Sequence, residues 1–342
     1  MCAFNNTECT MKPKLHYLPA IALLFAPLLA ENTANAASAP RACTNTAIYL
    51  HRACSYEAAD DLQIAAAICT NSANGATCLR DARADYNTRI QECSGFREER
   101  DDVCDAVGEA PYAPAFGPAF AANFVDPNKI GHGVAPNPFL PLVAGNTWTY
   151  KKNVLDDEGQ PEVETIHVVV TDATKLVDGV TCRVVRDTVM SGDNLKEDTS
   201  DWFAQDSRGN VWYCGEEVKD YESFEADRPE LPELVSRDGS FKAGRDGDKP
   251  GIIMLAAPRV GVTYREEASW NNAEDLSEVI SITGSDSTPA ASCRGTCLVL
   301  RAFSPLSPDG DEIKYYAPGV GEISNTKEET GVRAQLVEFT HR

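Results

Sequence analysis

The sequence CTNSANGATC occupies residues 69–78, where two cysteines enclose a short run rich in Asn, Ser and Gly. These three residue types favour turns. Two further cysteines precede this stretch and two follow it, and the six occur at spacings of 11, 15, 9, 15 and 11 residues. The palindrome fits a hairpin with nested bridges, because the two residue numbers of each pair add up to 147 in Cys43–Cys104, Cys54–Cys93 and Cys69–Cys78.

The same spacings favour helices over strands. Each residue of an α-helix turns by about 100°, so steps of 11 and 15 residues return close to the same face, whereas odd steps along a strand alternate between faces. Apolar residues of the first arm recur at steps of three and four, at Cys43, Ala47, Leu50, Cys54, Ala58, Leu62, Ala65 and Cys69. We predict a disulfide-stapled antiparallel helical hairpin at 41–107, with Gly75 at positive φ in the connection.

The bridges have a physical reason in the size of this segment. Two helices of this length bury too little apolar surface to be stable alone, and disulfides compensate for a small core. The hairpin is then either a stapled spacer or cap, or a docking module for another exported protein. The charged stretches RDARAD (80–85) and REERDD (97–102) favour the spacer.

The N-terminus resembles a secretory leader. Two lysines precede an apolar stretch at 18–30 that is too short to span a bilayer as a helix, and Ala34-Asn35-Ala36 fits the small-x-small cleavage rule. We predict a signal peptide at 1–36 and a periplasmic or extracellular protein. Met11 is the better initiator, which makes residues 1–10 an over-extended start. No other apolar run is long enough to predict a transmembrane helix.

The rest of the chain divides into a linker and a β-domain. Residues 108–139 are rich in Pro, Gly and Ala and lose helical periodicity, which indicates a linker partly packed on the β-domain. From 140 to 342, strand-like segments alternate with turn motifs such as DSRGN (206–210) and no helical pattern intervenes. The fold class is therefore α+β: the hairpin, then a mainly antiparallel β-domain built as a barrel, half-barrel or sandwich.

The four remaining cysteines of the exported chain suit two further disulfides. Cys293 and Cys297 lie close enough to enclose a small loop, CRGTC. Cys182 and Cys214 lie in two separate strand segments and would then pair across the sheet. An even number of cysteines in an exported protein favours bridges over metal binding.

Several segments of the β-domain are similar to a known family. NPFLPLVAGNTWTYKK (137–152), DWFAQDSRGNVWYCGE (201–216) and KYYAPGVGEI (314–323) resemble an uncharacterised family of secreted bacterial β-rich proteins. The resemblance covers roughly residues 136–340, and its most specific motif is D-W-F-A-Q-D-x-x-G-N-V-W-Y. Some members carry a similar Cys-rich helical segment at the N-terminus. The family implies export and a β-rich fold, and it supplies no catalytic residues.

Composition and motifs exclude several function classes. The formal net charge of −21 disfavours nucleic acid and anionic membrane surfaces, which need a surplus of Lys and Arg. Four histidines follow the leader, at 51, 132, 167 and 341, and none forms an H-x-H or H-E-x-x-H grouping. G-x-S-x-G and Gly-rich phosphate loops are also missing from the sequence. No catalytic residue is predicted, and the balance leans away from an enzyme.

Carboxylates are the one abundant source of chemistry. If 195–205 and 210–216 form a hairpin, Asp198, Asp201 and Glu216 approach one another. Such a group would bind Ca²⁺, which prefers hard oxygen ligands, or two of its members would perform acid–base hydrolysis. The alternative is that these acids only form turns and a solvated surface. No other cofactor is predicted.

Aromatic residues concentrate on the predicted strands. Several occur as consecutive pairs, so one member of each pair faces each side of the sheet. They form either an ordinary core or a concave aromatic cleft for a lipophilic or glycan ligand, with candidate ligand-binding residues Trp148, Trp202, Trp212, Tyr213 and Tyr315.

Three functional hypotheses are consistent with these observations. The first is an exported, non-catalytic binding or interaction protein with an aromatic-lined cleft. The second is an extracytoplasmic hydrolase that uses carboxylates. The third is a structural component of the cell envelope. The missing nucleophile and histidine sets favour the first or the third, and a filled interior would favour the third.

Overall fold

The structure is a computed structural model that describes residues 41–156, 159–224 and 226–342. The predicted signal peptide and the alternative start at Met11 lie outside these residues. None of the helices within the described ranges combines the length and the apolar character needed to cross a membrane.

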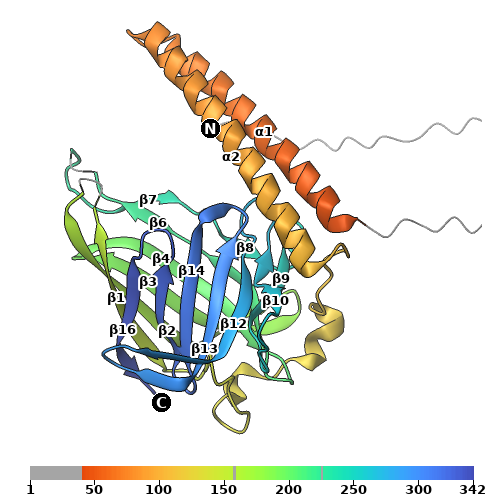
Figure 1. Cartoon of the computed structure of the whole chain (residues 1–342). Coiled ribbons are helices and arrows are strands. Elements are labelled where there is room, and N and C mark those ends of the chain that lie inside the picture. The colour runs from red at the N-terminus through yellow and green to blue at the C-terminus, as the bar shows by residue number, and fades with distance from the viewer. Residues whose placement is uncertain (1–40, 157–158, 225) are drawn as a thin grey trace, which may run out of the picture. The chain divides into compact units, whose positions relative to one another are not determined.

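Two long helices form the predicted hairpin, α1 (Ala42–Cys69) and α2 (Gly75–Val107) (Figure 1). All three nested disulfides are present, with Cα–Cα distances of 5.6 Å for Cys43–Cys104, 5.7 Å for Cys54–Cys93 and 5.5 Å for Cys69–Cys78. The buried residues of α1 are Ala47, Cys54, Ala58 and Cys69, all on the predicted stripe. Small side chains at this seam let the helices approach within disulfide reach.

The predicted reason for a glycine at position 75, a positive φ, is wrong. Gly75 is the first residue of α2 and does not adopt a positive φ. A Cβ at this position would lie 2.7 Å from the carbonyl oxygen of Cys69, so the tight connection needs a residue without a side chain. The constraint is close approach of the two helix ends, set by the Cys69–Cys78 bridge.

The β-domain is one antiparallel sheet that curls into a nearly closed barrel (Figure 1). Within the described residues the path of hydrogen-bonded neighbours runs β10-β12-β13-β14-β15-β16-β1-β2-β3-β4-β5-β9-β11, and β6, β7 and β8 attach beside it. The strands are β1 (Thr147–Leu155), β2 (Pro161–Val177), β3 (Val180–Ser191), β4 (Asn194–Gln205), β5 (Val211–Glu217), β6 (Asp220–Glu222), β7 (Glu233–Ser236), β8 (Phe241–Lys242), β9 (Lys249–Met254), β10 (Thr263–Arg265), β11 (Glu267–Ala268), β12 (Leu276–Ser287), β13 (Ser292–Ser304), β14 (Ser307–Ala317), β15 (Gly321–Lys327) and β16 (Arg333–Thr340).

The two ends of this path meet at one corner of the chain. β10 pairs with β12, β11 pairs with β9, and only Glu266 separates β10 from β11. The chain therefore passes from one edge of the sheet to the other within a single residue. Gly251 of β9 lies against this corner, where a Cβ would be 2.3 Å from the carbonyl oxygen of Arg265 and 2.4 Å from that of Glu266.

The linker packs on the outer face of the sheet and on one end of the barrel. Its two short 3₁₀ turns are η1 (Pro118–Asn123) and η2 (Pro127–Lys129). A second buried cluster lies outside the barrel, where Phe116 of the linker packs with Trp202 and the Cys182–Cys214 bridge. That bridge connects β3 to β5 across the intervening β4. Further along, Leu142 and Val143 enter the main interior core.

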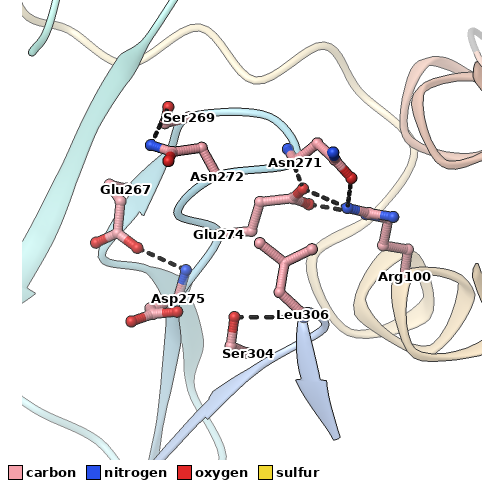
Figure 2. Close-up of polar contacts among 9 residues, drawn as sticks. All are labelled: Arg100, Glu267, Ser269, Asn271, Asn272, Glu274, Asp275, Ser304 and Leu306. Atoms are coloured by element: carbon pink, nitrogen blue, oxygen red, sulfur yellow. Dashed lines mark hydrogen bonds and ion pairs between the residues drawn. The ribbon is translucent and has the colours of Figure 1, made fainter. Parts of the chain in front are cut away.

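A buried ion pair fastens the hairpin to the barrel. Arg100 of α2 donates to both carboxylate oxygens of Glu274, at 2.6 Å and 3.0 Å, and both side chains are almost fully buried. Glu274 also accepts a hydrogen bond of 2.7 Å from the backbone N–H of Asn271 (Figure 2). Removing one member of such a pair leaves the other charge uncompensated in a low dielectric.

The pair gives a testable prediction for the attachment of the hairpin. Arg100→Met should lower the free energy of unfolding by about 3–5 kcal/mol, because the Glu274 carboxylate stays buried without a partner. Arg100→Met combined with Glu274→Met should recover most of this loss in urea titrations. Arg97→Met is the matched control: Arg97 pairs with Asp101 on the same helix at a more exposed position, so the cost should stay below about 1 kcal/mol. Equal losses in the single and double variants would contradict the prediction.

A second prediction concerns closure of the sheet. Gly251→Ala should lower the free energy of unfolding by about 2 kcal/mol or more, because the added methyl group collides with two backbone carbonyls. The control is Gly95→Ala in α2, where nothing lies within 4 Å of the added atom. This helical substitution should stabilise slightly. A Gly251→Ala protein as stable as the wild type in thermal unfolding would show that the corner has more room than described.

Candidate functional site

The barrel encloses a cavity of about 320 Å³. Because side chains of a strand alternate between its faces, every second residue of the surrounding strands points into this space. Most of the lining is apolar or aromatic and comes from the segment before β1 and from β1, β2, β3, β4, β9, β14 and β16: Leu140, Leu142, Trp148, Tyr150, Ile166, Val168, Val170, Val185, Phe203, Ile253, Met254, Tyr316 and Ala334. The polar side chains of the lining are few: Asp187, Asp201, Lys314, Glu322 and Asn325.

Two carboxylates share one wall of the cavity. Val185 of β3 pairs directly with Asp201 of β4, so Asp187, two residues beyond Val185, is a diagonal neighbour of Asp201 on the same face. Asp201 accepts a hydrogen bond of 2.5 Å from the hydroxyl of Tyr213. Oδ1 of Asp187 is buried and accepts no hydrogen bond from any described residue.

Burial controls the protonation of this wall. Desolvation, reinforced by Asp201 and Glu197, raises the pKa of Asp187 well above its usual range. Desolvation also raises the pKa of Asp201 to about 6, although the hydrogen bond from Tyr213 opposes the shift. Glu216, the cross-strand partner of Asp201, has a pKa raised to about 8 by burial and by the Asp201 charge.

The opposite wall carries the one cationic side chain of the cavity lining. Lys314 of β14 lies 3.6 Å from the carboxylate of Glu312. Burial alone would lower the pKa of Lys314, but Glu312 and Glu322 raise it above its usual value. Burial raises the pKa of Glu322, and Lys314 opposes that change. The ammonium group is therefore already compensated by acidic neighbours.

A further group of buried acids lies at the closing corner. The backbone N–H of Asp275 donates to Glu267 at 2.6 Å (Figure 2). The hydroxyl of Ser277 donates to Glu266. Burial raises the pKa of Glu266 to about 7 and that of Glu267 well above its usual range. These acids do not line the 320 Å³ cavity, and their hydrogen bonds lie within the corner.

The five predicted ligand-binding aromatics do not form one cleft. Trp148 lines the cavity. Tyr213 is not in the lining, but its hydroxyl donates a hydrogen bond to Asp201, which is. Trp202 and Trp212 pack in or against the second buried cluster beneath the linker, with Trp212 5.8 Å from Phe124 between ring centroids. Tyr315 is missing from the lining, and its neighbour Tyr316 takes the inward position.

The three predicted Ca²⁺ ligands do not all lie on one face of the sheet. Asp198 and Asp201 differ by an odd number of residues along β4, so they face opposite sides of the sheet. Asp198 pairs with Arg186 at 2.5 Å, whereas Asp201 points inward. No group of three or more His, Cys, Asp or Glu side chains in the described part of the chain is arranged to hold a metal ion. Asp201 and Glu216 lie directly opposite each other on β4 and β5, as expected, whereas Asp198 does not join them.

Sequence reasoning missed Asp187, Lys314, Glu322 and Tyr316. Alternation along the strands could have found some of them. Asp187 shares its face with Val185, and Lys314 shares its face with Tyr316. Choosing which of the two faces points inward needs the closed barrel.

A larger pocket of about 610 Å³ lies between the hairpin ends, the linker and β10. Its lining is mainly Ala, Gly, Pro and aromatic residues, and its main charged group, Arg265, already stacks on Tyr112 and Trp270. The interior cavity combines apolar walls with convergent polar groups, which is typical of small-molecule sites. We therefore take the interior as the candidate site.

Comparisons with known proteins add nothing to this geometry. The chain matches no protein-family model, no characterised protein and no solved structure. The resemblance to secreted bacterial β-rich proteins stays a prediction.

The buried acids predict a pH dependence of stability. Their pKa values are higher in the folded than in the unfolded chain, so the folded state holds protons that the unfolded state has lost above about pH 4. Stability should therefore fall as pH rises through the values of about 6, 7 and 8 for Asp201, Glu266 and Glu216. The midpoint of thermal unfolding should be higher at pH 5 than at pH 8.

A pair of variants isolates the contribution of one acid. Glu216→Gln should make the decline between pH 5 and pH 8 shallower by on the order of 1 kcal/mol or more. Glu217→Gln, at the next and more exposed position, should leave the slope unchanged. Parallel pH profiles for Glu216→Gln and the wild type would contradict the assignment.

Proposed function

We propose that this chain is an exported binding protein whose barrel interior holds a small, largely apolar ligand. The observation that carries the proposal is the interior cavity of about 320 Å³, walled by aliphatic and aromatic side chains and bearing few polar groups. Small-molecule sites have this composition and start at volumes of about 300 Å³. The apolar walls favour a lipophilic ligand over a glycan.

The two alternative functions receive less support. A carboxylate-based hydrolase would use the two carboxyl groups of the cavity wall, Asp187 and Asp201, but the lining holds no histidine, serine or cysteine beside them and is otherwise mainly apolar. A purely structural role leaves the interior space unexplained, because protein cores pack to high density. Use of the hairpin as a docking module stays a prediction.

Export rests on two supports. The structure contains five disulfides in residues 41–342, and such bridges persist in oxidising compartments. The leader-like sequence at 1–36 is the second support. N-terminal sequencing of the exported protein should give a first residue near Ala37, and an N-terminus well before Ala34 would contradict the predicted cleavage.

A cavity-filling variant tests ligand binding. The neutral fluorophore N-phenyl-1-naphthylamine should bind the wild type at one site. Ala334→Phe should weaken this binding by about tenfold or more, because Ala334 is buried and lines the cavity. Ala173→Phe is the control, since Ala173 is exposed on β2. Fluorescence titration measures both, and circular dichroism checks that the variants are folded.

Two results would contradict the proposal. One is a wild-type protein that does not bind the fluorophore. The other is a folded Ala334→Phe protein that binds it as tightly as the wild type, which would place the fluorophore outside the barrel.

A further inference from the structure

The polar side chains of the interior cavity are unequal in charge. Asp187, Asp201 and Glu322 supply three carboxyl groups to the lining, and Lys314 supplies the one ammonium group among the lining residues. Lys314 already has Glu312 at 3.6 Å and Glu322 nearby. Asp187 and Asp201, on the wall formed by β3 and β4, therefore have no cationic partner among the lining residues.

The cations closest to that wall in sequence are engaged elsewhere. Arg186, next to Asp187 on β3, points to the other face of the sheet and pairs with Asp198. Lys152 of β1 forms an ion pair of 2.7 Å with Glu164 of β2. Oδ1 of Asp187, buried and without a donor among the described residues, is the strongest sign that this wall receives a donor from a ligand.

Aromatic rings surround the same space. Tyr150, Phe203 and Tyr316 line the cavity, and Phe203 stacks on Tyr213 with ring centroids 4.8 Å apart. Ring faces attract cations, and carboxylates together with aromatic rings form a common recognition site for protonated nitrogen. The remaining walls are aliphatic and suit a hydrocarbon body.

We propose that the barrel interior binds a small apolar amine, with its protonated nitrogen at Asp187 and Asp201 and its hydrocarbon part against the aliphatic wall. This inference rests on the proposed function and specifies the ligand class. A carboxylate ligand is disfavoured because it would meet two acids on one wall and an already compensated lysine on the other.

Proton linkage gives the proposal a second consequence. Asp187 faces Asp201, Glu197, Glu322 and, more weakly, Lys152, and burial with the acidic neighbours keeps its pKa raised. A bound ammonium group stabilises the carboxylate form, so binding near neutral pH releases protons from the protein. The affinity for an amine should therefore rise between pH 6 and pH 8.

Three probes of equal chain length test the ligand class on the whole protein. n-Octylamine, n-octanol and n-octanoate compete with N-phenyl-1-naphthylamine at pH 7.5. We expect octylamine to bind at least about tenfold more tightly than octanol or octanoate, because its ammonium group forms a charge-assisted hydrogen bond with the carboxylates. Equal or tighter binding of octanoate or octanol would overturn the amine assignment.

Variants on one strand pair supply the control. Asp187→Asn should weaken octylamine by about tenfold and leave octanol within about twofold. Asp198→Asn, on the outer face of β4, should change neither affinity. If Asp187→Asn does not fold, the wild-type ranking of the three probes still decides the question.

The two proposals fail in different ways. Absence of fluorophore binding to the wild type overturns ligand binding in the barrel and the amine with it. Fluorophore binding without a preference for octylamine overturns the amine assignment alone. Calorimetry in two buffers of different ionisation enthalpy should detect the released protons, and no proton release at pH 7 would also count against the amine.

Discussion

The corner at Glu266 is the constraint on which the β-domain depends. One residue separates β10 from β11, and these strands pair with opposite ends of the sheet. The sheet therefore has an inside, and its edge strands are joined instead of being left open to other chains. Closure at such short range is possible because Gly251 brings no side chain against the carbonyls of Arg265 and Glu266.

Closure also sets the electrostatics of the interior. Strand alternation places Asp187 and Asp201 inside together with the apolar residues of β3 and β4. Burial desolvates these acids, so their charged forms are costly and their pKa values rise. A protein that keeps such groups in its core loses stability for it, and interior carboxyl groups beside a cavity are more readily explained by a ligand than by folding.

The hairpin depends on different physics from the barrel. The hairpin is held by local helical periodicity and three disulfides. The spacings of its six cysteines along the sequence were therefore enough to predict their pairing. Its attachment to the barrel depends on a pair 174 residues apart, Arg100 and Glu274. Nothing in the charged run REERDD marks Arg100 as the buried member, because only the docked barrel distinguishes it from Arg97.

The sequence by itself determined the stapled hairpin, the antiparallel class of the second domain and the pairing of all ten described cysteines, because periodicity and spacing are local properties of the chain. It also showed that one member of Trp202–Phe203 and of Tyr315–Tyr316 must face inward. Only the tertiary structure decided which one, and the answer moved the site from Trp202, Trp212 and Tyr315 to Phe203, Tyr316 and Asp187. The physical reason is that alternation fixes two faces, whereas the inside exists only after distant strands have closed the sheet.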